Sequence, residues 1–168
     1  MLHQVSQHHK NRWDGSLHQM IISRSMLMPA SYVESISAAS VGVVVRNSSG
    51  EVIISSWDFL GQFYNVNEAE LRACLAGLYI GLTLHQSIIL EIDCAFVRSF
   101  LANENLDRSP LVDLKKEALI IFTMLKNFDI AKINRQANKV AHEIAKFGFI
   151  NKSDGIFLNS VPPCVANF

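Results

Sequence analysis

The sequence has few cysteines and no net charge. Its three cysteines, Cys74, Cys94 and Cys164, are odd in number and widely spaced, which argues against a disulfide framework and against a structural zinc site. We expect reduced, partly buried thiols. With 15 basic and 15 acidic residues the formal net charge is zero, so overall charge does not favour tight nonspecific binding to nucleic acid. A local basic stripe is still compatible with this balance.

Long hydrophobic runs are also missing. No apolar stretch reaches the roughly 18 residues that a membrane helix needs, and the first ten residues contain no apolar block of the signal-peptide kind. We therefore expect an intracellular protein, in the nucleus or the cytoplasm, that is not secreted. The sequence does have a hydrophobic content of 49% over 168 residues, which is enough for one domain with its own core.

Charges are unevenly distributed along the chain. Residues 51–107 contain eight acids and two bases, whereas residues 115–152 contain eight bases and three acids. An acidic middle followed by a basic end indicates two faces with different roles.

The first part of the chain predicts a hairpin. Residues 40–47 and 51–57 are rich in β-branched side chains and are separated by the turn-forming segment 47–50, "NSSG". Before the hairpin, residues 19–28 form a weak candidate for a first strand. We expect residues 1–28 to be a poorly ordered arm around that candidate strand, and residues 29–164 to form the folded domain.

After the hairpin, helical and strand patterns alternate. The predicted helices cover residues 67–84, 96–102, 111–127 and 138–147, and the predicted strands cover 88–92 and 129–134. This order predicts an α/β sheet with antiparallel strands on one side and parallel strands on the other. Ligand sites in such sheets lie beyond the carboxyl ends of the strands.

Two carboxylates occupy positions that suit such a site. Glu70 lies in "NEAEL", in the first turn of the long predicted helix, and Asp93 ends the predicted strand 88–92. If the helix crosses the sheet beside that strand, both carboxylates lie at one end of the sheet. Carboxylate oxygens are hard ligands that suit Mg²⁺ or Mn²⁺.

Both carboxylates also have structural interpretations. Asn67 is a candidate N-cap residue, which would make Glu70 its N3 partner in a capping box. Asp93 is a candidate N-cap residue of the predicted helix 96–102. The residue pattern leaves these alternatives open.

Four sequence blocks, taken in their order along the chain, resemble a known family. They are "VGVVVRNSSGEVI", "NEAELRACLAGLYIGL", "IILEIDCAFV" and "INRQANKVAHEIAKFG". Together they resemble the ribonuclease H-like domain that is common in plants, a family similar to ribonuclease H type 1 and to the ribonuclease H part of reverse transcriptases. The resemblance runs from about residue 29 to about residue 164. It implies a ribonuclease H-like fold: a five-stranded mixed sheet, antiparallel in its first three strands and parallel in the remainder, with helices on both faces.

The resemblance also implies an activity. Members of the family are hydrolases, endonucleases that use four carboxylates and two Mg²⁺ ions to cut the RNA strand of an RNA–DNA hybrid. Glu70 matches the family's helix glutamate and Asp93 its strand-end aspartate, so both are implied as catalytic residues and metal ligands. Pro29 stands where the first catalytic aspartate is expected, and a proline offers no carboxylate. His142 matches the last aspartate, as in plant members. The implied binding of Mg²⁺ or Mn²⁺ is therefore impaired.

His142 has two interpretations. Histidine assists proton transfer near neutral pH, so the resemblance makes His142 a candidate catalytic residue. It is a poor ligand for Mg²⁺, and as a structural alternative it is a half-exposed helix residue.

Basic and polar residues near the chain's end are candidates for contact with a phosphate backbone. Such contacts position a duplex without reading its bases. Arg135 matches an arginine of the family's "R..N..AH" block. The candidates are Lys115, Lys116, Arg135, Asn138 and Lys139, with Lys132 and Lys146 as further bases.

The expected function is thus nucleic-acid binding with a weak, metal-dependent RNA–DNA hybrid ribonuclease activity. The alternative is a catalytically dead protein of the same fold, of retroelement origin, that binds nucleic acid or a protein partner. The expected partner is a hybrid or another nucleic acid, and no membrane.

Overall fold

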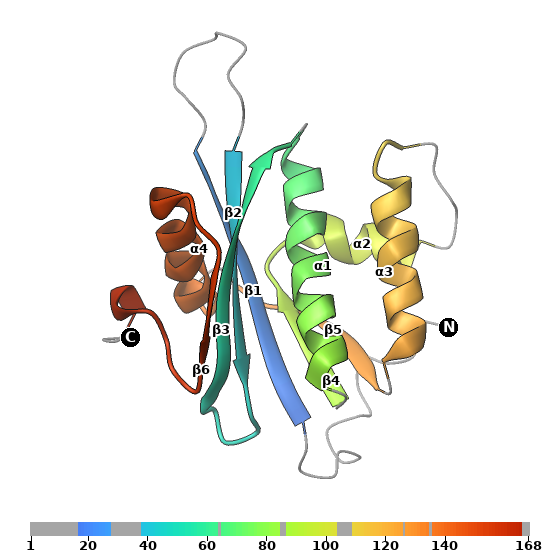
Figure 1. Cartoon of the computed structure of the whole chain (residues 1–168). Coiled ribbons are helices and arrows are strands. Elements are labelled where there is room, and N and C mark those ends of the chain that lie inside the picture. The colour runs from blue at the N-terminus through green and yellow to red at the C-terminus, as the bar shows by residue number, and fades with distance from the viewer. Residues whose placement is uncertain are drawn as a thin grey trace, which may run out of the picture.

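A computed structural model describes residues 17–27, 38–63, 65–84, 87–103, 109–125, 127–134 and 136–165. Its sheet has the strand order β5-β4-β1-β2-β3-β6 (Figure 1). The strands are β1 (Leu17–Leu27), β2 (Ala38–Arg46), β3 (Val52–Gln62), β4 (Ser87–Ile92), β5 (Phe128–Lys132) and β6 (Gly155–Leu158). The helices are α1 (Val66–Leu84), α2 (Ala95–Ala102), α3 (Val112–Met124) and α4 (Lys139–Asn151), followed by the 3₁₀ turn η1 (Pro163–Val165).

Strand directions confirm the predicted mixed sheet. β1 pairs antiparallel with β2, which pairs antiparallel with β3. On its other side β1 pairs parallel with β4, which pairs parallel with β5. No helix among the described residues is long and apolar enough to cross a membrane.

The weak candidate for a first strand is the central strand β1. Because β1 pairs with both β2 and β4, the folded domain includes residues 17–27, and the predicted domain start at residue 29 would cut the sheet in two. A central strand has partners on both edges, so pairing offsets its weak intrinsic pattern. The predicted disorder of residues 1–16 lies outside the described residues.

A sixth strand was not predicted. β6 has four residues and pairs antiparallel with the outer edge of β3. Its segment "GIFL" is too short to show the alternation by which a strand is recognised. Gly155 lets β6 approach the Trp57 side chain of β3 closely, because a Cβ at this position would lie 2.2 Å from Cζ2 of Trp57.

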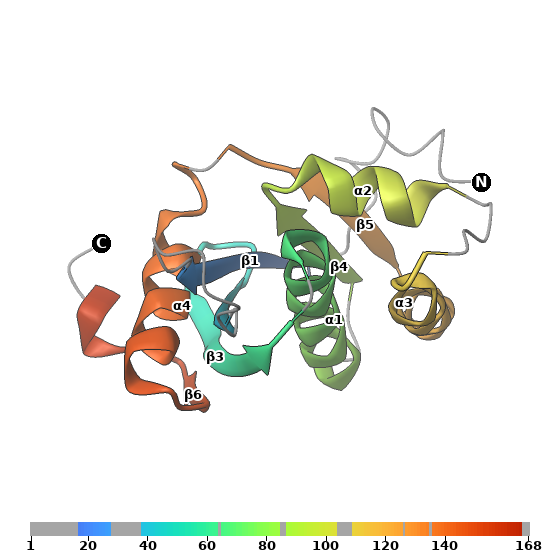
Figure 2. The ribbon, with the colours of Figure 1, turned by 90° about the horizontal axis from the view of Figure 1, so that it is seen from above.

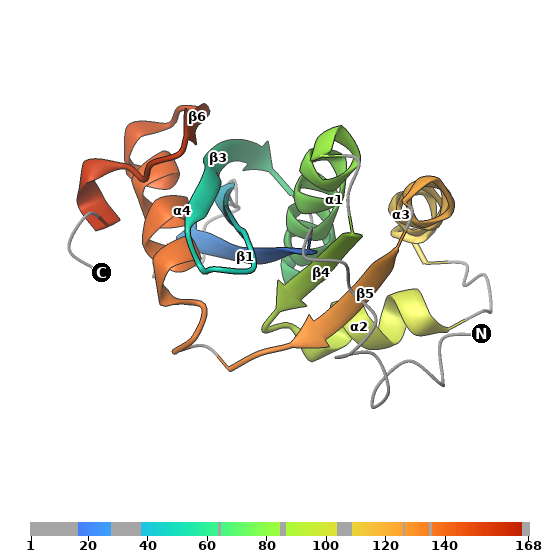
Figure 3. The ribbon, with the colours of Figure 1, turned by 90° about the horizontal axis from the view of Figure 1, so that it is seen from below.

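The helices cover both faces of the sheet (Figures 2 and 3). α1, with α3 packed against it, covers one face, and α4 covers the other face over β1, β2 and β3. Because both faces of the sheet are covered, the side chains of β2 are buried alternately on one face and the other. Val41, Val43 and Val45 join the core on the α1 side, whereas Val44 joins the core on the α4 side.

Gly42 lies on the α4 side of β2 and sets the distance between helix and sheet. A Cβ at this position would lie 2.2 Å from the carbonyl oxygen of Ala141 and 2.5 Å from the backbone nitrogen of Ala145. These are backbone atoms of α4, so they cannot move aside by a change of rotamer. The α4 backbone therefore rests directly on the backbone of β2.

We predict that Gly42→Ala lowers the free energy of unfolding by about 1–3 kcal/mol or more, because overpacking displaces α4 from the sheet. Urea unfolding measures the change. Ser48→Ala, in the exposed turn after β2, is the control and should leave the midpoint unchanged. Equal midpoints for Gly42→Ala and the wild type would contradict this packing.

Two carboxylates lie close together where β3 meets the segment before β6. Burial raises the pKa of Asp58 above its ordinary value, and the nearby Asp154 raises it further. Asp154 itself accepts a hydrogen bond from the backbone N–H of Phe59 at 2.6 Å. A raised pKa in the folded state means that ionisation of Asp58 costs stability once the pH exceeds that pKa. Below the ordinary value of 3.8 the cost is absent.

Asp58→Asn should therefore raise the melting temperature at pH 7, because it removes a half-buried charge beside Asp154. The gain should shrink as the pH falls and disappear near pH 3, where the wild-type carboxyl group is protonated in both states. Thermal melts of both proteins from pH 3 to pH 7 measure this. A gain of equal size at every pH would show that ionisation of Asp58 is not its source.

Candidate functional site at the carboxyl end of β4

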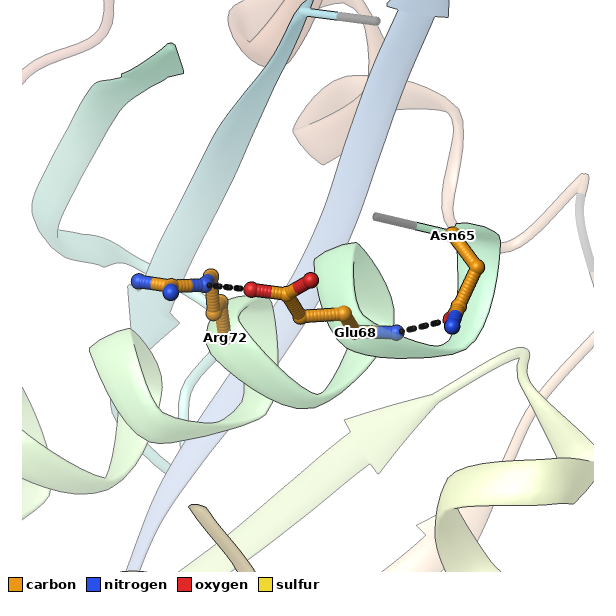
Figure 4. A network of polar contacts seen from close by, with 3 residues as sticks. All are labelled: Asn65, Glu68 and Arg72. Carbon is orange, nitrogen blue, oxygen red and sulfur yellow. Dashed lines mark hydrogen bonds and ion pairs between the residues drawn. The ribbon is translucent and has the colours of Figure 1, made fainter. Parts of the chain in front are cut away.

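The N-cap of α1 differs from the predicted one. α1 begins at Val66, and the backbone N–H of Glu68 donates to Oδ1 of Asn65 at 2.9 Å (Figure 4). Asn65 is therefore the N-cap residue and Glu68 the N3 residue. The carboxylate of Glu68, which is buried, accepts a hydrogen bond from Nε of Arg72 at 2.9 Å. The capping box with Asn67 and Glu70 is wrong by two residues, so capping does not account for Glu70.

Asp93 has no capping role either. β4 ends at Ile92 and α2 begins at Ala95, so the N-cap residue of α2 is Cys94. The interpretation of Asp93 as an N-cap is therefore wrong. Asp93 is half-buried and directly follows a strand that pairs in parallel with both of its neighbours. This is the position at which sheets of this type hold their ligands.

Cys74 lies near both Glu70 and Cys94, the residue after Asp93. Its thiol is buried, and burial, then Cys94, then Glu70 raise its pKa to about 12. Glu70 lies one turn before Cys74 on α1, and Cys94 comes directly after Asp93. The start of α1 and the end of β4 therefore meet around this thiol. A thiol with so high a pKa stays protonated and is not a nucleophile at neutral pH. All three cysteines are free, as expected.

The strand beside Asp93 supplies no carboxylate. β1 pairs with β4 from Leu17↔Ser87 to Ile21↔Glu91, and this register, continued by two residues, sets Ser23 level with Asp93. The strand reads "LHQMIISRSML" and contains no acidic residue. Pro29 lies outside the described residues, so the loss of the first catalytic aspartate at this position stays a prediction.

The predicted base Lys115 is not at the surface. It is 1% exposed, its Nζ donates to the carbonyl oxygen of Asn103 at 2.6 Å, and it lies 4.9 Å from the ring centroid of Phe100. Contact of Lys115 with a phosphate is therefore excluded, and that prediction is wrong. Its spacing from the buried Leu111 and Ala118 places it on the inner face of α3.

The other predicted contacts differ in exposure. Asn138 is 1% exposed and occupies the N-cap position of α4, so its predicted contact with phosphate is wrong for the same reason. Lys116 and Lys139 are exposed, and Lys116 forms an ion pair with Asp113 at 3.3 Å. His142 is exposed on α4. Arg135 lies outside the described residues.

An open hollow lies beside Asp93. It has a volume of about 430 Å³ and is lined by Asp93, Lys132, Ile133 and Asn134. The pairing of β4 with β5 brings these residues together, because the backbone N–H of Ile133 donates to the carbonyl oxygen of Ile92 at 2.9 Å. The sequence analysis named Lys132 as a base but did not predict that it lies beside Asp93. Their neighbourhood could have been inferred because both residues lie at the ends of parallel strands.

A family model described as reverse transcriptase-like matches residues 28–148. The chain belongs to the reverse transcriptase-like family. No curated protein matched it. The membership confirms the resemblance to the ribonuclease H part of reverse transcriptases.

Solved ribonuclease H structures share the fold of this family member. The N-terminal ribonuclease H domain of a Mycobacterium tuberculosis protein is 19% identical, with a TM-score of 0.67 over 81% of this chain and 95% of that one. Ribonuclease H1 from Halobacterium salinarum is 18% identical, with a TM-score of 0.66 over 82% and 99%. LC11 ribonuclease H1, solved with an RNA/DNA hybrid, is 17% identical, with a TM-score of 0.62 over 81% and 97%.

The resemblance to ribonuclease H implies divalent metal ions, which need a cluster of ligands. Among the described residues, no group of three or more His, Cys, Asp or Glu side chains lies close enough together to hold a metal ion. The resemblance implies Glu70 and Asp93 as two of four carboxylate ligands, and the sequence of β1 contains no further acid. The described residues therefore do not fit a two-ion centre.

We predict that Lys115→Met destabilises the protein by about 1–3 kcal/mol, because the carbonyl group of Asn103 loses its buried donor. Lys116→Met removes an exposed lysine one position along the helix, and its effect should stay within about 0.5 kcal/mol. Chemical denaturation of both variants gives the comparison. If both variants lost the same stability, the buried bond would not be the cause.

Proposed function

We propose that this protein binds RNA–DNA hybrids and hydrolyses their RNA strand weakly. The observation that carries the proposal is the placement of Asp93 at the carboxyl end of β4, with Glu70 at the start of the helix beside it and no acidic residue in β1. The fold adds support, because a ribonuclease H of similar fold was solved with a hybrid.

The expected weakness follows from charge. Cleavage of a phosphodiester needs stabilisation of the charge that develops in the transition state, together with an activated water. The negative charge of four carboxylates attracts cations to a ribonuclease H site, and each missing carboxylate reduces that attraction. The remaining carboxylates, Glu70 and Asp93, orient water and substrate less firmly than four would.

A second candidate function is hybrid binding without catalysis. The lack of any acid in β1 favours it, because the strand that pairs with β4 then offers no carboxylate for the chemistry. Membership of a reverse transcriptase-like family is consistent with the retroelement origin that this candidate includes.

A cleavage assay with a labelled RNA–DNA hybrid, in Mg²⁺ and separately in Mn²⁺, tests the proposal. We expect a rate at least about 100-fold below that of a ribonuclease H with four carboxylates, in line with the loss of one positioned group. We expect Asp93→Asn to abolish the residual cleavage.

The matched control is Asp113→Asn, which changes an exposed carboxylate on α3 and should leave cleavage unchanged. Equal cleavage by the wild type and Asp93→Asn would refute the catalytic role of Asp93. Hybrid binding with no cleavage at all in either metal would select the second candidate.

A further inference from the structure

We infer that Lys132 supplies, next to Asp93, the positive charge that holds a phosphate group of the nucleic acid in place without a metal ion. This inference rests on the proposed function and names the residue and the phosphate chemistry of that same site. It starts from the disagreement between the described residues and a two-ion centre.

The position of Lys132 is set by the sheet. Lys132 ends β5 level with Ile92, the residue before Asp93. The bond from Ile133 to Ile92 continues the pairing past the end of both strands. The next turn is held by Asn134, whose Oδ1 accepts a hydrogen bond from the backbone N–H of Ala137 at 2.8 Å. Backbone hydrogen bonds therefore fix the segments on which Lys132 and Asp93 line the same space.

Lys132 and Asp93 line the hollow but do not form an ion pair with each other. Among the described residues, neither Lys132 nor Asp93 has a partner for its side chain in an ion pair or a hydrogen bond. Lys132 is exposed and Asp93 is half-buried. An ammonium and a carboxylate that line one hollow without pairing leave room for a group that contacts the ammonium.

The other lysines that the structure describes lack this combination of exposure and position. Lys115 is buried against Asn103, Lys116 pairs with Asp113, and Lys146 pairs with Glu143 at 3.7 Å. Lys132 is the lysine that lines the hollow beside the strand end. It therefore has both the exposure and the position to contact a phosphate at this site.

The charge balance favours a phosphate in this hollow. The carboxylate of Asp93 repels a phosphate, and a two-ion site overcomes such repulsion with its cations. A lysine ammonium is a compact point charge that binds phosphate oxygens well. Asp93 is the acid and Lys132 the base among the described residues that line the hollow. The ammonium of Lys132 offsets the repulsion by Asp93, so binding does not require Mg²⁺.

Fluorescence anisotropy with a labelled RNA–DNA hybrid tests this inference, at several KCl concentrations, in EDTA and in Mg²⁺. We expect the wild type to bind the hybrid with equal affinity in EDTA and in Mg²⁺. We expect Lys132→Gln to weaken binding in EDTA by about three- to tenfold, and to reduce the slope of log affinity against log salt by about 1, the change expected for one lost phosphate contact.

Two variants serve as controls. Lys132→Arg keeps the charge and should keep the slope. Lys152→Gln removes an exposed lysine at the end of α4 that does not line the hollow, and should change the affinity by less than twofold. Equal melting temperatures for the variants and the wild type show that the effect arises in binding and not in folding.

The outcomes separate the two proposals. Wild-type binding that is lost in EDTA, or a Lys132→Gln variant with unchanged affinity and slope, overturns the role of Lys132 and leaves hybrid binding standing. A wild type that binds no hybrid under either condition overturns the proposed function itself.

Discussion

The position of β1 between β2 and β4 is the constraint on which the rest of this structure depends. Antiparallel pairing with β2 and parallel pairing with β4 join the hairpin half of the sheet to the half that carries the site. The parallel side brings the ends of β4 and β5 to one edge, where Asp93 and Lys132 line the same hollow. The antiparallel side places Gly42 under α4, whose backbone rests on the sheet.

The described part of the candidate site brings together the surroundings of two carboxylates and one exposed lysine. Glu70, one turn away, and Cys94, the neighbour of Asp93, both raise the pKa of the Cys74 thiol, so the start of α1 lies near the end of β4. The strand next to Asp93 contributes no acid, and an exposed lysine lines the hollow. Within the described part of the chain, the ammonium of Lys132 beside Asp93 favours contact with a phosphate group.

Strong periodic patterns predicted the elements well. The β-branched strands of the hairpin, the helix that became α1, and the short apolar strand β4 were all evident from the sequence, because each has a period or a turn signal of its own. Boundaries and faces were less accurate. The N-cap of α1 is Asn65 and not Asn67, since both are good caps and only the backbone path distinguishes them. Lys115 is buried, because its long aliphatic stem packs in the core and its amine reaches the carbonyl group of Asn103.

The sequence by itself determined the family, the mixed sheet and the positions of Glu70 and Asp93 at the start of a helix and the end of a strand. These are properties of local pattern and of motif order along the chain. Only the tertiary structure decided that residues 17–27 form the central strand, that β6 adds an edge, that Lys115 is internal and that Lys132 lies beside Asp93. Each of these depends on which segments pair across the sheet, and pairing between segments far apart in the chain leaves no signal in the residues of either segment alone.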